Sequence, residues 1–250
     1  MINIGDIVPK QFDMVLVGLS YLIAVLGSYV ALECTVRIPR PDGRAQIGFV
    51  LGGAVALGGV AIWSMHFIGM TALQTAIDIE YQVLPTLVSL IAAVVVSSLA
   101  LWFVGSGTFT TSKLLISGVL TGIGVAVMHY LGMAAMQMGA SLRWDMTIVT
   151  ISVVIAIIAA TVALWLAFNL RRSWQRSIAA LVMGAAVCGM HYTGMAAGTL
   201  VCAAMPAHGN SAIGGNDLSM AVFVIALMIL GAVVVYAILN WEPDDMATAS

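Results

Sequence analysis

The sequence alternates long apolar runs with short polar joints. Seven runs contain roughly 20 or more residues, the length at which a helix crosses a hydrocarbon core about 30 Å thick. The runs do not alternate polar and apolar residues in segments of about ten, as the strands of a membrane barrel do. The pattern therefore predicts an all-α integral membrane protein with seven transmembrane helices, at about residues 12–36, 47–70, 83–104, 113–136, 146–169, 177–200 and 219–240.

Composition supports a membrane environment for the whole chain. Hydrophobic residues make up 62% of the 250 residues and charged residues only 8%, whereas a soluble domain carries about 25% charge. The first apolar run follows Asp6, Lys10 and Asp13, and it lacks the basic segment and small-residue cleavage site of a signal peptide. We therefore expect this run to remain as a helix, and residues 1–250 to form a single seven-helix membrane domain.

The basic residues predict the orientation of the helices. Short loops rich in Lys and Arg stay on the cytoplasmic side of a membrane. Of the nine basic residues, seven fall in the first, third and fifth joints: Arg37, Arg40, Arg44, Lys113, Arg171, Arg172 and Arg176. This asymmetry predicts an N-terminus outside, a C-terminus in the cytoplasm, and even-numbered helices that run outward.

A histidine flanked by methionines occurs three times at the ends of even-numbered helices. The copies are 63 and 62 residues apart, so they indicate a repeated helix unit, and they place the three histidines at one depth near the outer face. They read Met65-His66-Phe67-Ile68-Gly69-Met70, Met128-His129-Tyr130-Leu131-Gly132-Met133 and Met190-His191-Tyr192-Thr193-Gly194-Met195.

Histidine and methionine at this spacing favour a metal site. At about 100° per residue, the methionine four positions after each histidine lies about 40° from it, whereas the preceding methionine points about 100° away. A single intramembrane histidine is as well explained by packing, but three at one level favour a functional site. The predicted ligands are His66, His129 and His191, with Met70, Met133 and Met195.

The donor set favours copper over the other metals. Imidazole suits copper, zinc and iron, and thioether sulfur selects Cu(I), so zinc and iron remain the alternatives. Tyr130 and Tyr192, each next to a motif histidine, are expected to donate a hydrogen bond to a bound ligand or to orient an imidazole.

With these motifs, the sequence resembles the MHYT domain family, an integral membrane sensor module of bacterial signalling proteins. The family motif Met-His-Tyr-Thr, in its longer form MHYxGM, matches letter for letter from Met190 to Thr193. The second copy has Leu131 in place of Thr, the first has Phe67 in place of Tyr, and all three keep the final Gly and Met. The resemblance covers about residues 12–240. It implies copper binding, sensing of O2, CO or NO, location in the bacterial inner membrane, and output through cyclic di-GMP signalling domains, either fused to the chain or acting as its partners.

Three classes of function are compatible with these features. A sensor of a diatomic gas or of redox state is first, a transporter or metal carrier is second, and a membrane metalloenzyme acting on a small molecule is third. The sequence contains none of the common catalytic motifs, such as a nucleophile elbow, a P-loop or HExxH, and this favours a non-enzymatic module. The basic residues are scattered over separate loops and do not form a nucleic-acid face.

Overall fold

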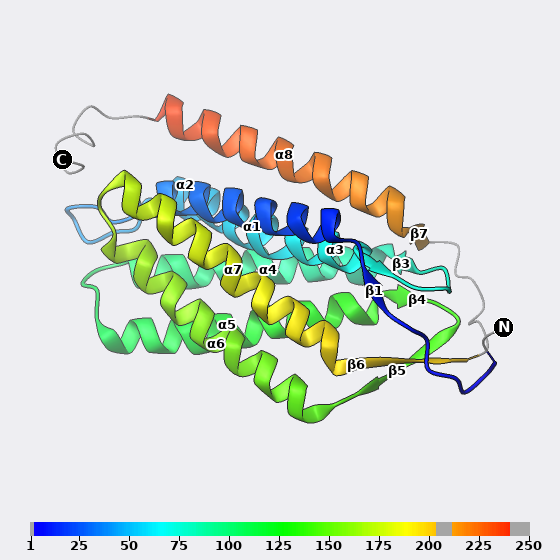
Figure 1. Ribbon diagram of the computed structural model, residues 1–250. Coiled ribbons are helices and arrows are strands. Elements are labelled where there is room, and N and C mark those ends of the chain that lie inside the picture. Colours follow the sequence, from blue (N-terminus) through cyan, green and yellow to red (C-terminus); the bar gives the residue numbers. More distant parts are fainter. Residues whose placement is uncertain (1–2, 204–211, 241–250) are drawn as a thin grey trace.

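The computed structural model describes residues 3–203 and 212–240, and in this part of the chain seven helices are long and apolar enough to cross a membrane. They lie side by side as a bundle, with the N-terminal segment at one end and the last helix leading to the other (Figure 1). The helices are α1 (Met14–Thr35), the continuous α2 (Ile47–Ala54), η1 (Val55–Ser64) and α3 (Met65–Thr71), α4 (Val83–Gly105), α5 (Thr111–Ala134), α6 (Met146–Asn169), α7 (Ser173–Ala197) and α8 (Gly215–Leu239).

The seven predicted spans are confirmed, and two of their boundaries follow from local hydrogen bonds. Asp13 accepts from the backbone N–H groups of Val15 and Leu16, and Asp145 does the same for Thr147 and Ile148. A side-chain oxygen at this position satisfies the N–H groups that a helix start leaves free. Helices α1 and α6 therefore begin directly after these aspartates.

The second helix forms the centre of the bundle. In its most apolar stretch 72% of the residues are buried inside the protein, compared with 17% for α8, which lies at the edge. Its middle part, η1, is a π-helix, in which Ser64 Oγ donates to the Gly59 carbonyl 2.8 Å away. This π-helical segment was not predicted from the sequence, and such segments are frequent near functional sites.

In the part of the chain that the structure describes, seven short strands lie at one end of the bundle, and the all-α prediction missed them. They form three antiparallel sheets from segments outside the helices, at the end where the three motif copies lie (Figure 1). The sheets pair β1 (Gln11–Phe12) with β2 (Leu73–Gln74), β3 (Glu80–Gln82) with both β4 (Met136–Gln137) and β7 (Ala212–Gly214), and β5 (Ala140–Trp144) with β6 (Gly198–Cys202). We call this the strand end.

Candidate metal centre

The three motif histidines meet at one point near the strand end. His66 comes from α3, His129 from α5 and His191 from α7, and each is only 1% exposed. One ring nitrogen from each lies within 4.8 Å of the others, and the ring centroids are 4.8 to 5.2 Å apart. Among the described residues, this is the one group of three His, Cys, Asp or Glu side chains close enough to hold a metal ion.

The Nδ1 atoms face one another across this point. Nδ1 of His66 lies 3.0 Å from that of His191 and 3.1 Å from that of His129. A neutral imidazole Nδ1 carries either one hydrogen or one lone pair, so a single Nδ1 cannot bond fully to two others. A cation with metal–nitrogen bonds of about 2.0–2.1 Å, whose ligand nitrogens lie about 3.3 Å apart, would use all three lone pairs. The residues present therefore fit a bound metal.

A cycle of glycines holds the three imidazoles in place. The motif glycine of each helix packs against the Nε2 edge of a histidine from another helix: Gly132 against His66, Gly194 against His129, and Gly69 against His191. A β-carbon at Gly69 would lie 2.5 Å from Nε2 of His191, and the other two glycines are tighter still. The glycine three residues after each histidine is thus required by the neighbouring imidazole.

The Nε2 atoms of the three histidines are buried and unpaired within the described part of the chain. Among the described residues none of the three has a hydrogen-bond partner, and all three are buried. Nε2 of each ring therefore faces a glycine and Nδ1 faces the common centre, so Nδ1 is the nitrogen that a ligand at the centre would meet.

The motif-final methionines are buried, and the two motif tyrosines pack edge-on against the histidine rings, with centroids 4.9 Å apart for His129 and Tyr130 and 4.7 Å apart for His191 and Tyr192. Met70, Met133 and Met195 are 0–2% exposed, so all three are in the core of the bundle. The Tyr130 hydroxyl bonds to Ser152 of α6 at 2.6 Å, and the Tyr192 hydroxyl bonds to Ser20 of α1 at 2.9 Å. Both tyrosine hydroxyls thus connect a histidine-bearing helix to a neighbouring helix.

The first motif replaces this connection with a tryptophan. Phe67 stands where the other copies have tyrosine and carries no hydroxyl. One turn earlier, Trp63 Nε1 donates to Ser89 Oγ of α4 at 3.0 Å and to the Thr86 carbonyl at 3.2 Å. Each histidine-bearing helix is therefore joined to a different outer helix through a serine, which sequence reasoning did not find.

The strand end covers the cluster. Each of the strands β2, β4 and β6 begins seven residues after its histidine, so the repeat extends beyond the helices. Lys10 Nζ, on the N-terminal segment, donates to the carbonyls of Met195 and Gly198 at 3.1 and 2.5 Å. Burial lowers the pKa of Lys10. This lysine ties the N-terminal segment to the end of α7. His208, the fourth histidine, lies outside the described residues.

Comparison with known proteins agrees with the repeat. The family model MHYT, described as "Bacterial signalling protein N terminal repeat", matches residues 59–117 and 122–180. The two matches are offset by 63 residues, the spacing of the first two motifs. No solved structure matches the chain.

Three curated bacterial proteins are similar to most of the chain. The bifunctional diguanylate cyclase/cyclic di-GMP phosphodiesterase MucR of Pseudomonas aeruginosa is 38% identical over 92% of it, the signaling protein YkoW of Bacillus subtilis 34% over 75%, and the cyclic di-GMP phosphodiesterase NbdA of Pseudomonas aeruginosa 36% over 73%. The chain spans 34% of MucR and 24% of each of the other two. With three motif copies, seven membrane-spanning helices and these relatives, the chain belongs to the MHYT family of membrane domains in bacterial signalling proteins.

Proposed function

We propose that this domain is a metal-dependent sensor in the bacterial inner membrane, with copper bound by His66, His129 and His191. The observation that carries the proposal is the convergence of three buried imidazoles, with one ring nitrogen of each within 4.8 Å of the others, where hydrogen bonds alone leave the nitrogens incompletely paired. The bound metal would supply a coordination position for a small ligand or a change of oxidation state. Zinc and iron are the alternatives to copper.

The surroundings of the cluster support a soft metal. The three buried methionines one turn beyond the histidines offer thioether sulfur, which favours Cu(I) over harder ions. In the described residues no carboxylate belongs to the metal-binding group, so calcium and magnesium lack their preferred oxygen ligands. Met70, Met133 and Met195 are accordingly the proposed additional ligands.

Burial supports a small, neutral signal such as O2, CO or NO, or electron transfer to the metal. Histidines that are 1% exposed do not meet a large or charged substrate in this arrangement. MucR and NbdA are named for cyclic di-GMP synthesis or hydrolysis, so we propose cyclic di-GMP signalling domains, fused or separate, as the output partners. A carrier is less well supported. On the side of the histidines away from the strand end lies an apolar cavity, and its lining offers no ionisable group to a passing ion.

Metal analysis of the detergent-purified protein tests the proposal. Replacement of any one of the three motif histidines with Ala should remove most of the copper, since the remaining pair lacks a full ligand set. His208→Ala is the matched control and should keep the copper. Equal loss from all four substitutions, or full occupancy after two motif histidines are lost, would refute the assignment. Optical and EPR spectra of the copper form with and without CO and NO then test sensing.

A further inference from the structure

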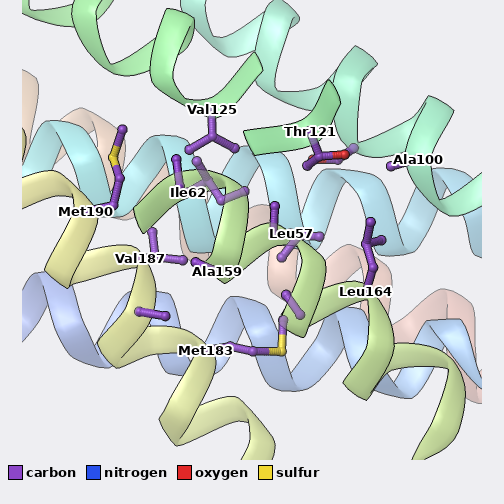
Figure 2. A pocket seen from close by; sticks show the side chains of 15 residues that line it. Leu57, Ile62, Ala100, Thr121, Val125, Ala159, Leu164, Met183, Val187 and Met190 are labelled. Carbon is purple, nitrogen blue, oxygen red and sulfur yellow. The ribbon is translucent and has the colours of Figure 1, made fainter. Parts of the chain in front are cut away.

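An apolar cavity of about 40 Å³ lies next to the histidine cluster, on the side away from the strand end. Three of its lining residues, Ile62, Val125 and Val187, each precede a motif histidine by four positions. Residues four apart share a helix face and are separated by about 6 Å along the axis. The cavity is therefore about one helical turn from the cluster. In Figure 2 these three side chains and Met190 lie toward one end of the cavity, and Thr121 and Ala100 toward the other.

The walls of the cavity suit a small neutral molecule. Nearly all of the lining is aliphatic or thioether, and α6 contributes only small or aliphatic residues there, including Ala156 and Ala160. A cavity needs about 10–15 Å³ to hold one water molecule. The cavity of about 40 Å³ is therefore larger than one water molecule requires. An apolar cavity of this kind takes up uncharged ligands and excludes ions.

Two hydroxyls in the lining lack partners. Ser97 of α4 and Thr121 of α5 are 1% and 4% exposed, and among the described residues neither oxygen has a hydrogen-bond partner. Hydroxyls in helices usually bond to a carbonyl in the preceding turn, as Thr161 does with Ile157 at 2.8 Å. A buried hydroxyl left without a partner costs about 1–3 kcal/mol. A ligand that weakly accepts a hydrogen bond would relieve this cost.

From the position, the lining and the hydroxyls together, we infer that this cavity is a binding site for a diatomic gas on its way to the metal centre. The inference rests on the proposed function for the identity of the gas. Access is from the bilayer, because the lining residues Ala159, Ala163 and Ala186 on α6 and α7 are only half-buried. Neutral diatomic molecules dissolve better in hydrocarbon than in water, so the lipid supplies them at this wall.

Xenon tests the cavity without any metal or gas chemistry. Metal-free protein in detergent is placed under xenon, and binding is followed by 129Xe NMR or by diffraction from pressurised crystals. We expect one xenon atom among Ile62, Val125 and Val187, since dry apolar cavities bind xenon. Ala160→Leu should abolish this site, whereas Val162→Leu, a change at an exposed position on the same helix, should not. Thermal unfolding and copper content verify that both variants fold.

The copper-loaded protein completes the test. Rebinding of CO after flash photolysis should be slower in Ala160→Leu than in the unmodified protein, and unchanged in Val162→Leu. Xenon binding without any gas ligation at copper would retain the cavity and refute the proposed function. Gas ligation without a xenon site, or ordered water joining the Ser97 and Thr121 hydroxyls in place of xenon, would refute the cavity inference.

Discussion

Replacement of Gly69 with Ala tests the glycine cycle that positions the imidazoles. The new β-carbon would lie 2.5 Å from Nε2 of His191, whereas ordinary contact begins at 3.4 Å. The ring must therefore move by about 0.9 Å, which exceeds the roughly 0.5 Å within which a functional site must be held. We expect copper affinity to fall by about 10–100-fold, the usual effect of losing a group that orients a metal ligand.

The assay is competition for Cu(I) with a chromogenic chelator in detergent, together with thermal unfolding. Gly189→Ala is the matched control, because it lies two residues before His191 on α7 and a β-carbon there meets nothing within 4 Å. Alanine favours a helix over glycine by about 1 kcal/mol, so helix propensity alone would make both variants more stable. Unchanged affinity in Gly69→Ala, or an equal loss in Gly189→Ala, would show that the glycines do not position the histidines.

Two further substitutions separate structural support from metal binding. Tyr130→Phe removes the hydrogen bond to Ser152 and should lower the free energy of unfolding by about 1 kcal/mol with copper affinity unchanged; a large loss of affinity with normal stability would instead show that the hydroxyl orients an imidazole. Lys10→Met removes both bonds to the end of α7 and should lower the free energy of unfolding by about 1.5–3 kcal/mol. A thermal midpoint equal to that of the unmodified protein would contradict this role.

Much of the architecture could be predicted because the bilayer imposes simple rules on sequence. The lengths of the apolar runs predicted the seven membrane-spanning helices, and the structure places the helix ends within a few residues of the expected positions. The repeat of His66, His129 and His191 at nearly constant spacing gave their common depth, and they do converge. The orientation from basic residues stays a prediction, although the structure places the histidines at the opposite end of the helices from Arg37 and Arg176.

Other features depend on contacts between distant segments, which local patterns do not contain. The π-helical segment η1 appears in an apolar stretch whose residues are equally compatible with an α-helix. The strands of the strand end are two to five residues long, so their alternation is too brief to detect. Glu33 of α1 pairs with Arg176 of α7 at 2.8 Å. The long-range partner lies 143 residues away, and sequence spacing alone does not reveal it.

The glycine cycle explains how a change at one histidine can reach all three helices. His66 rests on Gly132 of α5, His129 on Gly194 of α7, and His191 on Gly69 of α3, so the three contacts form a closed ring. A shift of one imidazole on ligand binding must move the helix that carries the next one, because close-packed contacts do not deform gradually. In the proposed sensor, a ligand would shift this ring only if it bound two arrangements of it with different affinities. Each helix also bonds through a serine to a different outer helix, Ser20 of α1, Ser89 of α4 and Ser152 of α6, so the movement has a path to the periphery of the bundle.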